Sequence, residues 1–166
     1  MHKLFYLFTI TIIFFSCKKD TTNAAGNVEI YMLKTFKTIM GKCQVDASTV
    51  VLQNTPIVTN RDIIEYSPTV YTFKLSDNAI EKIKILKDFT AFALTVDKRV
   101  IYYGFFKPGY SNSSCAHSIT MDIDWMANDK ILMNVGYPAP IQGITIDDER
   151  NNPTLMATLQ SQGKLK

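Results

Sequence analysis

Cys43, Cys115 and His117 are residues whose types could together bind a soft metal ion. Cys115 and His117 are two residues apart, so on a strand the thiol and the imidazole would lie on the same face. Cys43 could supply a third soft ligand, and zinc and copper both favour thiolate and imidazole ligands. A Cys-x-His pair with one distant cysteine lacks the spacing that zinc modules share. A small thiol or metal-binding (zinc or copper) envelope protein is therefore one functional hypothesis.

The same two cysteines also suit a disulfide. An even pair of cysteines in an oxidising compartment is typical of a disulfide bond. A bridge between Cys43 and Cys115 would close a loop of about 70 residues and stabilise the fold by roughly 4 kcal/mol, because it restricts the unfolded chain. Two buried free thiols are the remaining alternative. In either of these cases His117 is a surface or hydrogen-bonded histidine, and we expect no cofactor.

No set of residues in the sequence predicts a catalysed reaction. No serine is flanked by the glycines of a nucleophile elbow. The acidic residues 147–149 lack the alternating oxygen ligands and the glycine of an EF-hand, so we expect a solvated loop there. Lys and Arg outnumber Asp and Glu by 18 to 15, a net charge too small to predict nucleic-acid binding. We therefore expect a protein that is not an enzyme.

The first residues have the pattern of an export signal. Lys3 precedes an apolar run over residues 4–15, which is too short to cross a bilayer that needs about 20 residues. The run ends in Ser16 and Cys17, and this ending resembles the lipobox of bacterial lipoproteins, in which the cysteine is acylated and becomes the new N-terminus. The resemblance implies lipidation of Cys17, for example with palmitate, and attachment in the bacterial cell envelope, with the outer membrane as the expected location.

The lipobox divides the sequence into three parts. Residues 1–16 are the predicted signal peptide, and residues 17–26 are polar and suit a flexible tether between lipid and protein. Residues 27–166 then form a single predicted α+β domain. The mature chain, residues 17–166, has a normal size for one hydrophobic core.

Residues 69–106 are the stretch in which the local signals agree best. Alternating apolar residues predict a strand over 70–75. Ser76 is a good helix cap, and apolar residues at spacings of three and four continue the predicted helix to about residue 87. Alternation then returns on both sides of Asp97 and Lys98, which predicts a β-hairpin. Lys98 stands where a glycine would accept a positive φ without strain.

Weaker signals place the other elements. Strands are predicted over residues 28–33, 49–53, 115–123 and 131–135. The first is apolar on more than one side, which favours a central position in a sheet. Asn60 is expected to cap a short helical turn that leads to Tyr66. A final helix is bracketed by Pro153 at its first position and Gly163 after its last turn.

Three consecutive segments of this order resemble a known family. They are PIVTNRDI at 56–63, the strand and helix that follow, and the hairpin sequence FALTVDKRVI at 92–101. Together they resemble the head region of the first periplasmic domain of SecD, a protein-export subunit, over about half of the mature chain. Asn60 and Lys98 replace glycines of that family, and the membrane helices of SecD are absent. The resemblance implies an α+β fold of ferredoxin-like character, a mixed or antiparallel sheet with helices packed on one face.

The resemblance also implies binding rather than catalysis. The SecD head region is thought to engage emerging polypeptide, and no catalytic residue transfers from it. We therefore expect a lipid-anchored envelope domain that binds a protein or peptide and reaches the membrane through its lipid. Neighbouring residues on a strand point to opposite faces, so Tyr103 and Phe105 are expected in a second packed layer or in a binding surface. Tyr110 in the next loop would extend such a surface.

Overall fold

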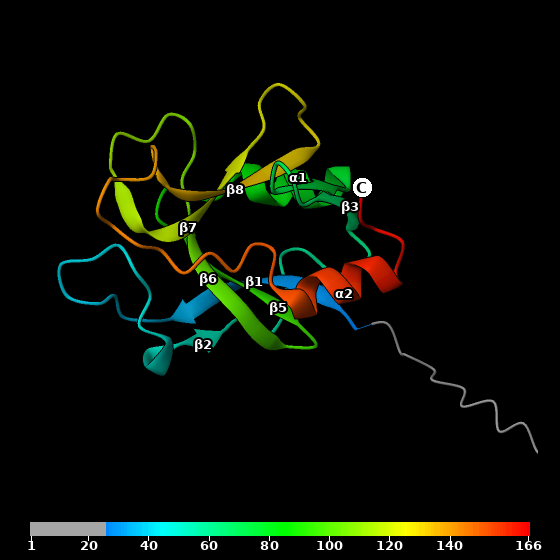
Figure 1. The fold of residues 1–166 in the computed structure, drawn as a ribbon, viewed down its shortest axis with the longest axis horizontal. Coiled ribbons are helices and arrows are strands. Elements are labelled where there is room, and N and C mark those ends of the chain that lie inside the picture. The colour runs from blue at the N-terminus through cyan, green and yellow to red at the C-terminus, as the bar shows by residue number, and fades with distance from the viewer. Residues whose placement is uncertain (1–25) are drawn as a thin grey trace, which may run out of the picture.

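The computed structural model describes residues 26–166. Within this range the chain forms one eight-stranded sheet and two α-helices (Figure 1), so the predicted α+β class is confirmed. The strands are β1 (Val28–Thr35), β2 (Val51–Leu52), β3 (Ile63–Ser67), β4 (Thr72–Leu75), β5 (Ala91–Val96), β6 (Arg99–Phe106), β7 (Cys115–Ile123) and β8 (Lys130–Tyr137). The helices are α1 (Asp77–Lys84) and α2 (Pro153–Ser161), and a 3-10 turn (Ala47–Thr49) precedes β2. Neither described helix is long and apolar enough to span a bilayer.

The strand order is β2-β1-β5-β6-β7-β8-β4-β3. All neighbouring pairs are antiparallel except β6 and β7, which are parallel. The sheet is therefore mixed, as predicted. It has two four-stranded halves, and Figure 1 shows β1, β5 and β6 below β7 and β8. The two halves are joined only where β6 meets β7.

The main hydrophobic core takes side chains from both halves of the sheet and from both helices. Phe92 of β5 and Phe73 of β4 are fully buried in it, together with Ile83 of α1 and Leu155 of α2. Ser76 accepts a hydrogen bond from the N–H of Ala79 and caps α1, as the sequence predicts. Both helices are held by the burial of one apolar face, which is the usual source of helix stability in a domain.

A second core lies on the other face of β5. The larger residues of β5 face the main core, and the small residues Ala91 and Ala93 face the second one, where they meet Leu33, Val45, Phe105 and Cys115. All six residues of β5 are buried. This confirms the alternation seen in the sequence and shows that β5 is covered on both faces.

The hairpin between β5 and β6 is confirmed, and so is the unusual geometry of its turn. Asp97 and Lys98 have φ values of 50° and 64°, the positive values that a two-residue hairpin turn requires. The Asp97 carboxylate accepts a hydrogen bond of 2.8 Å from the N–H of Asn27. This contact ties the start of the described chain to the turn.

The helical turn predicted between Asn60 and Tyr66 is wrong. Residues 63–67 are instead the edge strand β3, which pairs with β4. The Asn60 side chain does not cap a helix, because its oxygen accepts a hydrogen bond from the N–H of Val28. Asp62 makes the local turn by accepting bonds from the N–H and the hydroxyl of Thr59. Long-range pairing has therefore overridden the local helix signal.

Two element boundaries and the position of one strand in the sheet also differ from the sequence prediction. Helix α1 ends at Lys84, before residue 87, because Ile85 is the C-cap and is 83% exposed. Strand β4 begins at Thr72, because Tyr71 has a φ of 54° and turns the chain. Strand β1 is not central, since only the two-residue strand β2 separates it from the sheet edge.

Candidate functional site

The two halves of the sheet separate beyond a short parallel contact and leave a cleft. Strands β6 and β7 pair only over residues 104–106 and 119–121. In the described chain no strand pairs with residues 99–103 of β6 on the side that faces β7. β7 has an irregular register between Cys115 and Ile119, and such bulges bend a strand. The two strands therefore diverge and present two backbone edges to one space.

The cleft has a volume of about 190 Å³. Two of its walls are the strands themselves, and two further segments complete it. Its lining residues are Ile101, Tyr102 and Tyr103 of β6, His117, Ser118 and Ile119 of β7, Gln44 and Val45, and Ile146, Asp147 and Glu149. The space is thus lined by apolar and aromatic residues of β6, by His117 and Ser118 of β7, and by two residues with carboxylates.

A disulfide holds the wall that contains Gln44 and Val45. Cys43 and Cys115 are bonded, with their Cα atoms 5.1 Å apart, so the predicted bridge is confirmed. The hydroxyl of Ser118 donates a 2.8 Å hydrogen bond to the Cys43 carbonyl. The segment around Cys43 is therefore attached to β7 by a covalent bond and a hydrogen bond, and Val45 packs into the second core beside it.

The opposite wall is held by Arg150. Its guanidinium makes two hydrogen bonds of 2.7 Å to the carboxylate of Asp148 and lies 3.6 Å from the centre of the Tyr71 ring. It also donates a 2.9 Å bond to the carbonyl of Met133 in β8. The bonds from Arg150 lower the pKa of Asp148 below its ordinary value. This planar clamp fixes one end of the segment that carries Asp147 and Glu149.

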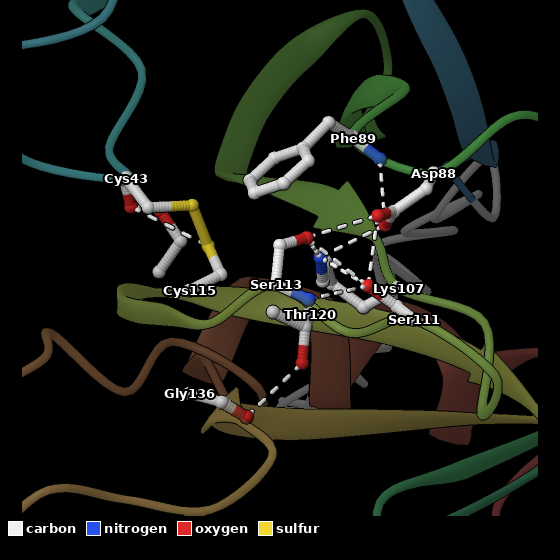
Figure 2. The surroundings of a disulfide bond; sticks show 10 residues. Cys43, Asp88, Phe89, Lys107, Ser111, Ser113, Cys115, Thr120 and Gly136 are labelled. Atoms are coloured by element: carbon white, nitrogen blue, oxygen red, sulfur yellow. Dashed lines mark hydrogen bonds and ion pairs between the residues drawn. A yellow bond between two sulfur atoms is a disulfide. The ribbon is translucent and has the colours of Figure 1, made fainter.

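A buried lysine anchors the loop that leads into β7. Lys107 is fully buried, and Figure 2 shows its ammonium between Asp88, Ser111 and Ser113. All three oxygens lie 2.8 Å from Nζ. The Phe89 ring centre lies 3.7 Å away, which adds a cation–π contact. An ammonium bound in this way has each of its three hydrogens engaged, so Lys107 acts as a structural cation and not as a base.

Asp88 collects the other hydrogen bonds of this cluster. The hydroxyls of Ser111 and Ser113 donate to its carboxylate, as does the N–H of Phe89. Partial burial alone would raise the pKa of Asp88, but hydrogen bonds from Lys107, Ser111 and Ser113 outweigh burial and lower it. The cluster ties the end of β6 to the loop before Cys115. Sequence reasoning placed Lys107 only in a turn-rich loop, and the signal for its burial was its position directly after two apolar residues of a strand.

The Tyr102 hydroxyl is a buried polar group beside the cleft. Tyr102 is 5% exposed, and its hydroxyl has no hydrogen-bond partner among residues 26–166. Burial raises the pKa of this phenol well above its ordinary value. Buried polar atoms are nearly always bonded, and this hydroxyl is an exception among the described residues; the Tyr102 ring packs in the main core against Phe92.

The structure separates the aromatic residues that the sequence grouped as a binding surface. Tyr103 lines the cleft and also packs against the second core. Phe105 is 2% exposed and belongs to that core, which is the packed-layer alternative. Tyr110 is 69% exposed in the loop after β6 and does not line the cleft. Only Tyr103 is thus brought to the candidate site.

The metal hypothesis needs Cys43, Cys115 and His117 as free ligands, and the structure does not provide them. His117 lies in the cleft, while the thiols of Cys43 and Cys115 are bonded to each other. Among residues 26–166 no group of three His, Cys, Asp or Glu side chains is placed to hold a metal ion. The ligand set would require a reduced protein. Cys17, the signal peptide and the tether up to residue 25 lie outside the described residues.

Comparison with known proteins leaves the site to be interpreted from its own geometry. The chain matches no protein-family model, no curated protein and no solved structure.

Proposed function

We propose that this chain is a lipid-anchored domain of the bacterial cell envelope that binds an extended segment of a protein or peptide and catalyses no reaction. The observation that carries the proposal is the cleft between β6 and β7. In the described chain, residues 99–103 and 115–118 have no strand partner on the sides that face each other. Unpaired strand edges are templates for a further strand, and peptide recognition by strand addition uses such an edge.

The walls of the cleft suit a peptide better than a small cofactor. Main-chain hydrogen bonds to β6 or β7 would supply affinity that does not depend on sequence, and Tyr103 and Ile101 would contact alternate side chains of the peptide. The walls are kept in place before binding by the disulfide and by the hydrogen bonds of Ser118 and Arg150. A preformed site of this kind lowers the ordering cost of binding.

We propose no catalysed reaction because the cationic side chains near the site are already bound to other residues of the chain. The ammonium of Lys107 is bound to three oxygens, and the guanidinium of Arg150 is bound to Asp148. The cleft does hold His117, but in the described chain no hydrogen bond connects its side chain to a serine or cysteine. General-base activation of a nucleophile needs such a contact.

The finer description of the fold is part of the same proposal. The order β4, α1, β5, β6 agrees with the strand, helix and hairpin of the SecD head region. We therefore propose that residues 56–106 correspond to that region and that the fold has ferredoxin-like character, extended here to eight strands. Fold analogy is a weak argument for function, so the binding proposal depends on the cleft.

Hydrogen exchange tests strand addition directly. Peptides that bind would be selected from a displayed random library against the full chain, purified in a mild non-ionic detergent. We expect a bound peptide to slow amide exchange within residues 99–103 or 115–118 by at least about tenfold, because newly bonded N–H groups exchange only after the strand opens.

His117→Trp should fill the cleft and abolish that protection, whereas Tyr110→Ala, outside the cleft, should leave it unchanged. Protection confined to other segments would contradict the proposed site. A reproducible turnover activity without any partner would contradict the proposed function itself.

Lipidation of Cys17 is tested by a separate substitution. Cys17→Ser removes the thiol that is acylated, so radiolabelled palmitate fed to expressing cells should enter the wild-type protein and not the variant. The variant should move out of the membrane fraction or remain unprocessed, because several acyl tails are needed for stable attachment. Unlabelled wild-type protein that is cleaved at another residue would show that the lipobox interpretation is wrong.

A further inference from the structure

The charge of the cleft is one-sided. Asp147 and Glu149 are its carboxylates, and neither Lys nor Arg is among its lining residues. His117 is the one lining side chain that can become a cation. A ligand that brings a positive charge would therefore meet two carboxylates, while an anionic ligand would be repelled.

These two carboxylates are not neutralised by the chain itself. Asp148, which stands between them in sequence, is occupied by Arg150. Within residues 26–166 neither Asp147 nor Glu149 has an ion pair, and Glu149 accepts one hydrogen bond, from the amide of Asn152.

Two further features of the same cleft favour a side chain with a cationic end. Tyr103 supplies an aromatic ring in the wall formed by β6, and guanidinium or ammonium groups are attracted to such rings. The part of the cleft lined by Ile101 and Ile146 is apolar and would cover the methylene groups of a Lys or Arg side chain.

We propose that the cleft between β6 and β7 selects an extended polypeptide segment with a Lys or Arg side chain, whose cationic end lies at Asp147 and Glu149. This inference deepens the proposed function and rests on it. Main-chain bonding to the strand edges gives affinity for extended segments in general, and the two carboxylates give selectivity for the basic residue. Electrostatic complementarity acts mainly on selectivity in this way.

The test compares three capped peptides that differ at one position. Each is a short run of alternating Thr and Val with a central Arg, a central citrulline or a central Glu, and binding to the full chain in detergent is measured by fluorescence anisotropy. Citrulline keeps the shape of Arg and lacks its charge. We expect the Arg peptide to bind about fivefold more tightly than the citrulline peptide, the effect of roughly one exposed ion pair with an aromatic contact. The Glu peptide should bind most weakly.

Asp147→Asn should reduce the preference for Arg over citrulline, and Asp147→Asn with Glu149→Gln should abolish it without weakening the citrulline peptide. Glu81→Gln is the matched control, because Glu81 lies on the exposed side of α1 and away from the cleft; it should keep the full preference. Equal binding of the Arg and citrulline peptides to the wild-type protein would overturn this inference and leave the proposed function standing. Binding of none of the three peptides would overturn both.

Discussion

Replacing Asp88 with asparagine is expected to lower the free energy of unfolding by about 3 kcal/mol. The substitution keeps the shape of the side chain and removes the charge opposite Lys107, which is fully buried. Breaking a buried ion pair by removing one partner is strongly destabilising, because the remaining charge stays away from water. The value is at the lower end of the usual range, since Asp88 is 31% exposed and two serine oxygens remain on Lys107.

Urea unfolding of the single and double variants measures this effect. Lys107→Met removes the stranded charge, so Asp88→Asn with Lys107→Met should be less destabilised than the sum of the two single variants. Glu81→Gln breaks the ion pair with Lys84 on the surface of α1 and should change stability little, because exposed ion pairs contribute little. If the losses of unfolding free energy in the two single variants add up to the loss in the double variant, Asp88 and Lys107 are not energetically coupled.

The same cluster gives a pH dependence with a defined sign. The pKa of Asp88 in the folded protein lies below its unfolded value of 3.8, so the folded state favours the carboxylate. The stabilisation is complete above about pH 5 and is lost as the pH falls through the lowered pKa. The stability difference between wild type and Asp88→Asn should therefore shrink below about pH 4. A difference that stays constant through this range would contradict the role given to the carboxylate.

Elements with strong local periodicity could be predicted from the sequence. Strand β7 has the predicted bounds Cys115–Ile123, because Ile119, Met121 and Ile123 alternate with polar residues. The hairpin of β5 and β6 could be predicted for the same reason, including the positive φ of Lys98. The segment from Asn60 to Tyr66 could not, because its conformation depends on pairing with β4 and on a hydrogen bond that the N–H of Val28, 32 residues away, donates to the Asn60 side chain.

The candidate site was only partly accessible to sequence reasoning. The disulfide followed from counting cysteines in a chain that we expected to be exported, and Tyr103 followed from alternation on β6. The cleft itself arises from the bend of β7 between Cys115 and Ile119, and no local pattern encodes the point at which two parallel strands diverge. Asp88 and Lys107 flank the β5–β6 hairpin, and the pairing of Ala91 with Phe105 brings them together. The two serines that complete the cluster lie in the loop before β7, and no local pattern predicts that they reach Lys107.

Loss of the Cys43–Cys115 bond is expected to reduce both stability and peptide binding. The bond joins residues 72 positions apart, and closing a loop of this length stabilises a fold by about 4 kcal/mol in the chain-entropy treatment. Cys43→Ala with Cys115→Ala removes the bond without placing a new polar group at Cys115, which is fully buried. Urea unfolding of this variant and of wild type, each without reductant, measures the difference.

The effect on binding follows from the position of the bond. Cys43 carries the wall with Gln44 and Val45, and without the bond this wall is attached to β7 mainly through the hydrogen bond from Ser118. A mobile wall must be ordered again when a peptide binds, so the affinity for a cleft-binding peptide should fall. Cys17→Ser is the control for the loss of a thiol as such and should leave both stability and affinity unchanged. If the alanine variant unfolds at the wild-type urea concentration but no longer binds the peptide, the bond shapes the cleft without stabilising the fold. If the variant binds the peptide as well as the wild type does, the wall containing Val45 does not contribute to the site.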